Sequence, residues 1–338
     1  MTSAEQHGPV AVVGTTSWGT TLALILGRRG IDVRLLARSD AEAQRLASDG
    51  ELAARLPGHP FPPSLRVTAD WAAGMDGAPF VLFAVPSHTL RANARRAAPH
   101  VSADAIVISA CKGLEQGTFK RMSVVLAEEL PDAASNLCAL SGPNLAREVV
   151  RGLPSATVVA SSSPDAASSV QRLFNSPTFR VYTNTDIIGT ELGGTLKNVM
   201  AIGAAICDGM ALGDNAKAAF VTRGLAEMVR LGVAAGAQAA TFAGTAGFGD
   251  LIATCYSNLS RNYRVGLALA EGRTLEEAIE SLGGQVAEGV GTTSAALEMA
   301  NALGVEAPIA AATARVLFDG ASPQDALLEL MARAPRQE

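Results

Sequence analysis

The sequence predicts an α/β domain built on a doubly wound, mostly parallel sheet, followed by an all-α domain. Short apolar runs and helical stretches alternate through the first half of the chain, which is the order that parallel sheets require. The apolar runs are continuous rather than alternating, as expected for strands that are covered on both faces. Strand signals stop after about residue 185, and a length of 338 residues agrees with about two domains.

Apolar runs bounded by glycine, proline and serine are the predicted strands of the first half. They cover residues 10–13, 33–37, 80–85, 105–110, 137–140, 156–160 and 179–182. Between them we expect a helix over 20–29, which Gly30 ends, and another over 89–98 with Ser87 as its cap. This order of strands and helices predicts a doubly wound sheet.

Helical patterns follow one another in the second half of the chain. They cover residues 191–210, 217–235, 260–271, 274–282, 293–303 and 323–334. Thr274 and Glu277 have the spacing of a capping box, and Ser322-Pro323 is a cap followed by proline at the first helical position. We therefore expect a first domain over residues 1–186 and an all-helical, substrate-binding domain over residues 187–338.

Composition excludes several classes of partner. Charged residues make up only 17% of the chain, with a net charge of −5, which argues against binding to nucleic acid or to an anionic membrane. The N-terminus lacks the basic and apolar segments of a signal peptide, and the two long uncharged stretches, 8–27 and 231–249, are broken by glycine, threonine or glutamine. The four cysteines are scattered without metal-ligand spacing, as in a reducing compartment. We expect a cytoplasmic protein without membrane insertion or a metal site.

The segment Gly14-Thr15-Thr16-Ser17-Trp18-Gly19 lies directly between the first predicted strand and its helix. A glycine-rich turn at this place presents backbone N–H groups and a helix N-terminus to a pyrophosphate. Gly14 would make the turn and Gly19 would let the helix pack closely on the sheet. Thr16 replaces the middle glycine of the usual motif, and we expect its side chain to crowd the phosphates. The turn alone equally suits a plain strand–helix connection, but within its βαβ pattern it favours a Rossmann-like dinucleotide-binding domain.

Arg38 follows the second predicted strand, 24 residues after Gly14. Sites that select NAD usually place an acid near here to bind the ribose 2′-hydroxyl, and we identify none. Arginine and the adjacent Ser39 instead suit a 2′-phosphate. The residues therefore favour NADP(H) as the preferred cofactor, with NAD(H) as a second one, over the alternative of an ordinary solvated arginine.

Two of the four lysines stand at places where chemistry is expected. Lys112 follows the fifth predicted strand, at a carboxyl strand end, where such sheets bind ligands. Lys197 lies in a helix of small and apolar residues, and burial there would lower its pKa toward the range of a general base. The alternative for Lys197 is a side chain that extends to solvent.

A third group of residues suits an anion. Ser260 is a natural N-cap, which puts Arg261 and Asn262 in the first helical turn, where free N–H groups and the helix dipole favour negative charge. The arginine adds a forked donor that matches a phosphate. Ordinary capping explains the same residues. Asp250, in a predicted tight turn over 247–250, could likewise cap residues 251–255, and Glu288 is by itself a loop acid.

Taken in order, several segments closely resemble the bacterial-type NAD(P)-dependent glycerol-3-phosphate dehydrogenases. The resemblance spans nearly the whole chain, and its most specific part runs from Gly194 through Lys197-Asn198 to Gly213-Asp214-Asn215. The matching segments are Ser17 to Ala23, Val85 to His88, Lys112 to Glu115, Ser141 to Glu148, Glu191 to Asn215, Gly249 to Cys255, Ser260 to Asn262, and Val286 to Gly289.

The resemblance implies a homodimeric enzyme that interconverts sn-glycerol 3-phosphate and dihydroxyacetone phosphate, for phospholipid synthesis, at a site between its two domains. Lys197 would exchange the proton of the C2 hydroxyl, and Lys112 would touch both cofactor and substrate. The other implied substrate residues are Gly142, Asn144, Asn198, Asp250, Ser260, Arg261 and Asn262. The implied cofactor residues are Gly14, Ser17, Trp18, Gly19, Arg38, Ala146, Arg261, Val286 and Glu288.

Two departures from the family pattern accompany this resemblance. Thr15-Thr16 replaces a small or glycine pair, and Asn144 stands where threonine is common. We therefore expect an active enzyme with loose cofactor binding, which Thr16→Gly would tighten. One alternative is a 3-hydroxyacid dehydrogenase of the hydroxyisobutyrate type, which has a similar helix-borne lysine but recognises a carboxylate. Another is a silent paralogue that binds NADP(H) as a redox sensor, which only the altered loop favours.

Overall fold

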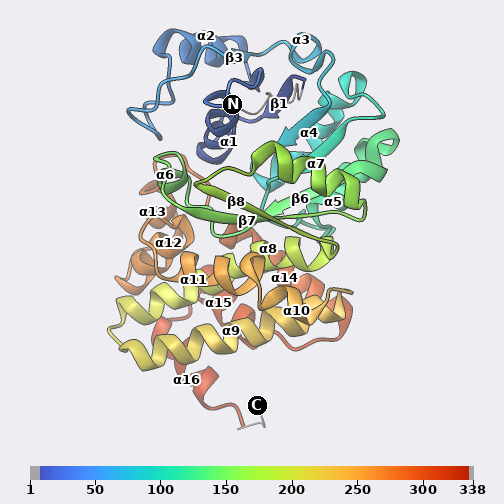
Figure 1. The fold of residues 1–338 in the computed structure, drawn as a ribbon. Helices are drawn as coiled ribbons and strands as arrows, with labels where there is room; N and C mark the ends of the chain where they lie inside the picture. Colours follow the sequence, from blue (N-terminus) through green and yellow to red (C-terminus); the bar gives the residue numbers. More distant parts are fainter. Residues whose placement is uncertain (1–7, 335–338) are drawn as a thin grey trace. The chain divides into compact units, whose positions relative to one another are not determined.

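The computed structural model of the chain describes residues 8–334, which fall into two compact units (Figure 1). Unit 1 contains the residues up to Cys111 and Met122–Ile187, and unit 2 contains Lys112–Arg121 and the residues from Ile188 onward. The first domain was predicted to end at residue 186, and unit 1 ends one residue later, at Ile187. The prediction left Lys112–Arg121 in the first domain, whereas this segment packs with unit 2, because Leu114 is buried in the helical core there.

Unit 1 is built on one eight-stranded sheet in the order β3-β2-β1-β4-β5-β6-β7-β8. Neighbouring strands are parallel except for the antiparallel pair β6–β7. This confirms the predicted doubly wound, mostly parallel sheet. The strands are β1 Val10–Val13, β2 Val33–Leu36, β3 Leu65–Thr68, β4 Phe80–Phe83, β5 Ile106–Ser109, β6 Leu137–Ser141, β7 Ser155–Ala160 and β8 Phe179–Asn184.

All seven predicted strands are present, with ends that differ by at most two residues. The strand that the prediction missed, β3, lies at the edge of the sheet beside β2. Its sequence is Leu-Arg-Val-Thr, and only its first residue is buried. An edge strand of this kind has no continuous apolar run, so the pattern that identified the central strands does not mark it.

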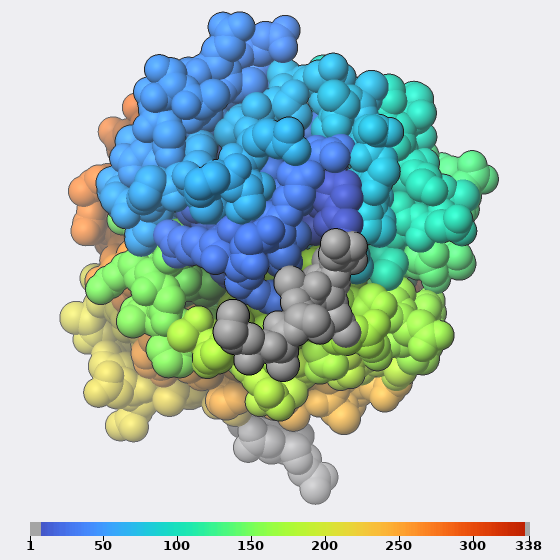
Figure 2. Space-filling view, turned by 45° about the horizontal axis from the view of Figure 1, so that its top comes forward, coloured from blue at the N-terminus to red at the C-terminus, as the bar shows by residue number. Residues whose placement is uncertain are grey.

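The helices of unit 1 alternate with these strands. They are α1 Ser17–Gly27, α2 Asp40–Asp49, α3 Trp71–Met75, η1 Ser87–Thr89, α4 Leu90–Ala97, η2 Ala98–His100, α5 Met122–Glu129, η3 Pro131–Asn136, α6 Ala146–Val149 and α7 Pro164–Phe174. Ser87 does not cap α4 as predicted, because Ser87 is itself the first residue of the 3-10 turn η1 and Thr89 directly precedes the helix. The connection between α2 and β3 folds against α1, where Ser64 Oγ donates to the Gly27 carbonyl at 2.6 Å; in Figure 2 it is exposed beside α1.

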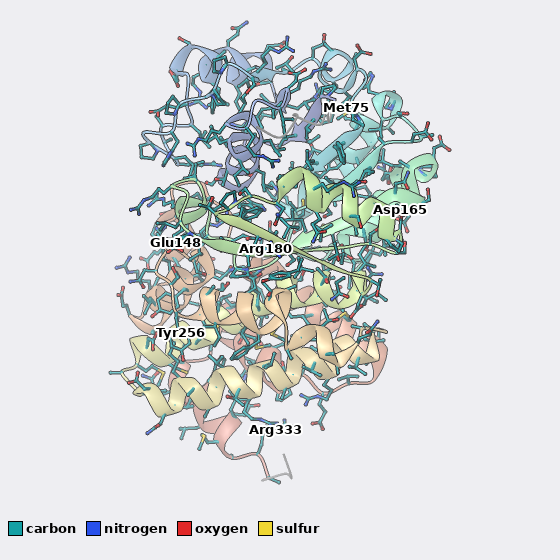
Figure 3. The ribbon with its side chains drawn as sticks, in the orientation of Figure 1. Met75, Glu148, Asp165, Arg180, Tyr256 and Arg333 are labelled. Carbon is teal, nitrogen blue, oxygen red and sulfur yellow. The ribbon has the colours of Figure 1, made fainter. Side chains whose placement is uncertain are left out.

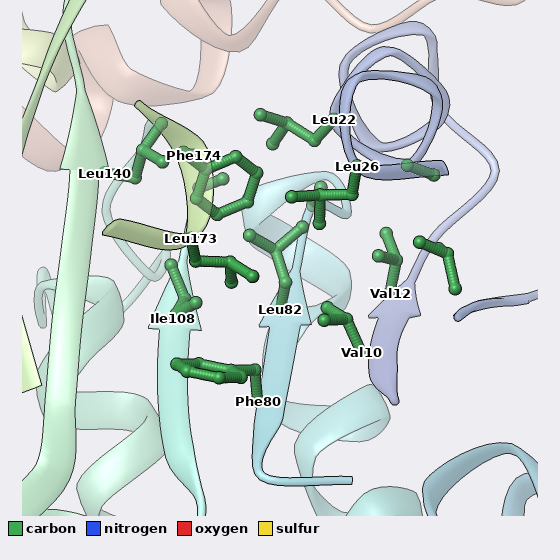
Figure 4. Packing of buried hydrophobic residues seen from close by; sticks show 14 of the residues in the cluster. Val10, Val12, Leu22, Leu26, Phe80, Leu82, Ile108, Leu140, Leu173 and Phe174 are labelled. Carbon is green, nitrogen blue, oxygen red and sulfur yellow. The ribbon is translucent and has the colours of Figure 1, made fainter. Parts of the chain in front are cut away.

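The central strands of the sheet in unit 1 are buried on both faces. Val10, Val12, Leu82 and Ile108 pack on one face against α1 and α7, through Leu22, Leu26 and Phe174 (Figure 4). The alternate residues, among them Ala11, Val13, Val81, Phe83 and Val107, pack on the other face against α3, α4 and α5. Because successive strand residues point to opposite faces, burial on both sides requires the continuous apolar runs seen in the sequence.

Within the described residues, the regular elements of unit 2 are helical, which confirms the predicted all-α domain. The predicted capping box of Thr274 and Glu277 and the Ser322 cap are both present. The helices are α8 Ile187–Gly209, α9 Asp214–Ala234, α10 Ala239–Phe242, η4 Thr245–Gly249, α11 Asp250–Cys255, α12 Arg261–Ala270, α13 Leu275–Glu280, α14 Glu288–Leu303, α15 Pro308–Phe318 and α16 Pro323–Met331.

Helix α8 runs through the core of unit 2, and residues 189–207 along it are all buried. Small residues allow this burial because neighbouring backbones approach very closely. A Cβ atom on Gly193 would lie 2.7 Å from the Ala246 carbonyl oxygen, and one on Gly266 of α12 would lie 2.2 Å from that of Ile202. The polar side chains of α8 are therefore held inside the unit. Among residues 8–334, no helix combines the length and apolar character needed to cross a bilayer.

Candidate active site

Two lysines meet one carboxylate in unit 2. Lys112 Nζ donates to Asp250 Oδ2 at 2.7 Å, and Lys197 Nζ donates to Asp250 Oδ1. Lys197 Nζ also donates to Thr254 Oγ1 at 2.7 Å. The Asp250 and Lys197 side chains are only 1% and 7% exposed. Three residues that the sequence analysis singled out are thus brought together, while Thr254, one helical turn beyond Asp250, was missed.

The turn before α11 sets the position of Asp250. Residues Thr245–Gly249 form a single π-helical turn rather than the predicted tight turn. Gly247 is required there, because a Cβ atom would lie 2.3 Å from the Phe242 carbonyl oxygen. Asp250 is the first residue of α11, and no side chain caps that helix. The interpretation of Asp250 as a cap is therefore wrong, since its carboxylate binds the two lysines.

Burial controls the acidity of Lys197. Loss of solvent lowers the pKa of Lys197 to about 7; the Lys112 ammonium adds to this lowering, while Asp250 opposes it. The alternative in which this lysine extends to solvent is wrong, because its side chain is buried. A lysine with a pKa near neutrality can both donate and accept a proton under physiological conditions.

Two buried amides connect the helices beside these lysines. Asn262 Nδ2, on α12, donates to Asn198 Oδ1, on α8, at 2.8 Å. The backbone N–H of Gly289, in the first turn of α14, donates to Asn262 Oδ1 at 2.9 Å. Gly289 is required at this approach, because a Cβ atom would lie 2.6 Å from the Asn198 carbonyl oxygen. The amides therefore hold the starts of α12 and α14 against α8.

The start of α12 has the predicted geometry. Ser260 is its N-cap, and Ser260 Oγ accepts a hydrogen bond from the Tyr263 backbone N–H at 3.2 Å. Arg261 and Asn262 follow in the first turn of a ten-residue helix, with Arg261 exposed. The dipole and N–H groups of such a turn favour an anion, and the guanidinium beside them adds positive charge.

A second buried lysine lies behind this helix start. Lys217 Nζ, on α9, donates to Asp208 Oδ2 at 2.5 Å and lies 3.9 Å from the centroid of the Tyr256 ring, at the end of α11 (Figure 3). Tyr263 Oη donates to the same Asp208 oxygen. Burial and the bond to Asp208 raise the pKa of Tyr263 to about 12. Asp208, Lys217 and Tyr263 thus join α8, α9 and α12, and Tyr263 directly follows Asn262. The sequence did not indicate a role for this cluster.

In unit 1 the loop after β1 has the close packing that was predicted. Gly14 has φ +114°, and a Cβ atom on Gly19 would lie 2.2 Å from the Gly14 carbonyl oxygen. Thr16 is the N-cap of α1, where its Oγ1 accepts from the Gly19 N–H at 3.0 Å and donates to the Ala84 carbonyl at 2.7 Å. The Thr16 hydroxyl is thus engaged within the loop, which argues against the expected crowding of the phosphates.

An acid does reach the end of β2, contrary to the sequence analysis. Glu42, in the first turn of α2, accepts from the Arg38 backbone N–H at 3.2 Å and lies 3.3 Å from Arg38 Nε. Its other oxygen accepts from Thr15 Oγ1 at 3.0 Å. Ser39 is the N-cap of α2. The expectation that no acid lies near this strand end is therefore wrong, because Glu42 folds back from the first turn of α2 to the Arg38 backbone.

The end of β6 carries buried polar atoms without partners among the described residues. These are Asn144 Oδ1 and Ser141 Oγ. Asn144 Nδ2 donates to Thr157 Oγ1 at 3.0 Å, which fixes the amide with its oxygen unpaired. A Cβ atom on Gly142 would lie 2.9 Å from the Thr157 Cα atom, so only glycine fits between these two strands. Buried acceptors normally have a donor, so this edge of the sheet suits a ligand with N–H or O–H groups.

The remaining predicted cofactor residues lie in both units. Ser17 and Trp18 begin α1, and the Trp18 indole packs on the core with its centroid 6.3 Å from that of Phe179. Ala146 begins α6, where its carbonyl accepts from Thr21 Oγ1 at 3.4 Å. In unit 2, Val286 precedes α14 and Glu288 is its first residue. Within residues 8–334, no cluster of histidine, cysteine and carboxylate side chains could hold a metal ion.

Two family profiles together match most of this chain. The family profile of the NAD-dependent glycerol-3-phosphate dehydrogenase N-terminus matches residues 9–167, and that of the C-terminus matches residues 186–328. Glycerol-3-phosphate dehydrogenase (NAD(P)+) of Dehalococcoides mccartyi is 48% identical over 331 residues, covering 97% of this chain and 92% of the relative.

Two further proteins extend the comparison. The corresponding protein of Corynebacterium glutamicum is 44% identical over 329 residues, which cover 97% of this chain and 99% of the relative. The crystal structure of glycerol-3-phosphate dehydrogenase from Coxiella burnetii superposes with a TM-score of 0.92 at 38% identity, covering 96% of this chain and 99% of that one. Both sequence and fold therefore agree with the resemblance inferred from the motifs.

Proposed function

The chain belongs to the NAD-dependent glycerol-3-phosphate dehydrogenase family, and we propose that it reversibly reduces dihydroxyacetone phosphate to sn-glycerol 3-phosphate. The observation that carries this proposal is the buried contact of Lys197 and Lys112 with Asp250. A nicotinamide cofactor, NAD(P)H, supplies the hydride when bound. The product would serve as the glycerol backbone for phospholipid synthesis.

Lys197 is the proposed catalytic acid and base. When the C2 carbonyl accepts a hydride, its oxygen gains negative charge and must receive a proton. The Lys197 ammonium would donate that proton and become a neutral amine; in the oxidation direction the amine would accept the C2 hydroxyl proton. A pKa of about 7 suits both directions. Asp250 and Thr254 fix the position of Nζ through their hydrogen bonds.

Lys112 and Asp250 would set the charge around the reacting oxygen. Two ammonium groups and one carboxylate leave one net positive charge at this buried place while Lys197 is protonated. Fixed positive charge stabilises an oxyanion most strongly where water is excluded. Asp250 in turn favours the protonated form of Lys197, which the reduction requires.

The start of α12 is the proposed site for the substrate phosphate. Ser260, Arg261 and Asn262 combine a helix N-terminus with a guanidinium. Binding of the phosphate, remote from C2, would supply energy that orients the carbonyl at Lys197. By the family resemblance, Gly142, Asn144 and Asn198 would also contact the substrate.

The residues of unit 1 fit a dinucleotide. The tight turn at Gly14 leads into the N-terminus of the eleven-residue helix α1, where backbone N–H groups suit a pyrophosphate. Arg38 supports preference for NADP(H), with NAD(H) as a second cofactor. The other proposed cofactor residues are Ser17, Trp18, Gly19, Lys112, Ala146, Arg261, Val286 and Glu288.

We propose in addition that the protein acts as a cytoplasmic homodimer. All four cysteines are free thiols, which suits a reducing compartment. The dimer follows from the family resemblance. Light scattering behind size-exclusion chromatography tests it, and a monomeric mass at working concentrations would overturn it.

The test of the proposed function is the initial rate of NADPH oxidation, and separately of NADH oxidation, with dihydroxyacetone phosphate. We expect rapid turnover with both cofactors and a faster rate with NADPH. Absence of turnover by protein with a cooperative melting transition would overturn the proposal. Turnover of 3-hydroxyisobutyrate instead would identify a hydroxyacid dehydrogenase, and a cofactor-induced melting shift without any turnover would identify a redox sensor.

A further inference from the structure

The carboxylate of Glu42 lies between two loops at the carboxyl edge of the sheet. One of its oxygens accepts from Thr15 Oγ1 at 3.0 Å, in the loop after β1. The other accepts from the Arg38 backbone N–H at 3.2 Å and lies 3.3 Å from Arg38 Nε, in the loop after β2. The Glu42 side chain is only 13% exposed, whereas that of Arg38 is 87% exposed. The acid is therefore fixed by the fold, and the guanidinium extends from it into solvent.

The topology identifies this position within a dinucleotide site. Strands β1 and β2 are parallel neighbours, with Val13 paired to Leu36 at their carboxyl ends. In doubly wound folds, the loop after the first strand binds the pyrophosphate, and the end of the second strand reaches the ribose 2′ substituent. An acid at the second place selects the 2′-hydroxyl of NAD(H). Glu42 supplies that acid from α2.

We propose that Glu42 selects between the two cofactors, accepting a hydrogen bond from the 2′-hydroxyl of NAD(H) and opposing the 2′-phosphate of NADP(H). It opposes the phosphate in two ways, through like charge and through its ion pair with the Arg38 guanidinium that would otherwise face the phosphate alone. Arg38, which favours NADP(H), and Glu42, which favours NAD(H), thus form one ion pair. This assignment rests on the proposed nicotinamide cofactor of unit 1.

Thr15 is the positioning residue for this carboxylate. Its hydroxyl donates to Glu42 Oε1, 27 residues further along the chain. Thr15 replaces the small residue usual at this place in the loop, and this hydrogen bond gives its side chain a partner. Alanine at this position cannot make that bond. The substitution Thr15→Ala therefore acts on cofactor choice through Glu42, and in a Glu42→Ala background, where no acceptor remains, it should leave the NADPH-to-NADH affinity ratio unchanged.

The decisive variant is Glu42→Gln, which keeps an acceptor for Thr15 and removes the charge. The measurement is the Kd of NADPH and of NADH by fluorescence titration, which needs no turnover. We expect NADPH to bind more tightly and NADH more weakly, with the affinity ratio moving about tenfold toward NADPH. Asp40→Asn is the matched control, because it removes an exposed carboxylate from the same helical turn; its ratio should stay as in the wild type.

Two outcomes would overturn the assignment. One is an affinity ratio for Glu42→Gln within twofold of wild type, and the other is a ratio that moves toward NADH. Arg38→Ala provides an opposite test, since it should weaken NADPH more than NADH. If the folded wild-type protein binds neither cofactor, the proposed function itself fails; if it binds both without turnover of dihydroxyacetone phosphate, the function fails while the Glu42 titration still decides this assignment.

Discussion

The charges at the candidate active site of unit 2 are buried, whereas the Arg38 guanidinium at the end of β2 in unit 1 faces solvent. Asp250 is 1% exposed and has two lysine partners, while Arg38 is 87% exposed and pairs with one glutamate. Interactions among charges strengthen as water is excluded, and exposed pairs contribute little to stability. A change in unit 2 should therefore alter the reaction itself, and a change at β2 should alter only which cofactor is used.

The largest effect is expected for Lys197→Ala. Loss of the proposed proton donor should lower kcat by about a thousandfold in both directions. Binding of NADPH should be retained, because the cofactor residues of unit 1 are untouched. Stopped-flow or steady-state rates, together with a fluorescence titration of NADPH, measure the two quantities. Near-normal turnover would overturn the role of Lys197.

A smaller but still large effect is expected for Asp250→Asn. Without this carboxylate, two ammonium groups would face each other, and the pKa of Lys197 would fall below its value of about 7. Reduction requires the protonated lysine, so kcat at neutral pH should decrease by about a hundredfold. The alkaline limb of the rate profile should move to lower pH. An unchanged limb would show that Asp250 does not govern the acidity of Lys197.

Tyr263→Phe tests the cluster behind the phosphate site. Tyr263 directly follows Asn262, and the variant loses its hydrogen bond to Asp208. The start of α12 should therefore be held less precisely. We expect the KM for dihydroxyacetone phosphate to rise about fivefold, with kcat within twofold of wild type. Tyr182→Phe, an exposed tyrosine of β8, is the control. Equal changes in kcat and KM would indicate general destabilisation instead.

The smallest effect is expected for Thr16→Gly. The Thr16 hydroxyl is the N-cap of α1 and binds the Ala84 carbonyl, so its loss should lower the free energy of unfolding by about 1 kcal/mol. Thermal or urea unfolding measures this change. The Kd of NADPH should not decrease, in contrast to the expectation drawn from the sequence alone. A severalfold tighter Kd would restore the view that this side chain crowds the phosphates.

The fold was largely predictable because its determinants are local. Continuous apolar runs identified the central strands, and the Ser260 and Thr274 caps marked helix starts. The same patterns failed at β3, whose edge position leaves it without an apolar run. Helix α8 was recognised as unusually apolar, and its burial explains the lowered pKa of Lys197.

The candidate site was predictable only in part, because its contacts join distant positions. Lys112 and Asp250 are 138 residues apart, and no spacing rule connects them. Glu42 looks like an ordinary first-turn acid of a capped helix, which is a common arrangement. Its contact with Thr15 depends on the parallel pairing of β1 and β2, so it became visible only once the strands were placed.

The central claim is that buried Lys197 carries the proton, and the pH dependence of kcat/KM for dihydroxyacetone phosphate reduction tests it most directly. Measured between about pH 5.5 and 9, the value should be high on the acid side and fall through an apparent pKa of about 7, with the reverse trend for glycerol 3-phosphate oxidation. The substrate phosphate titrates near pH 6, and comparison with Asp250→Asn separates that contribution. A reduction rate that stays constant or rises between about pH 6 and 9 would contradict the account.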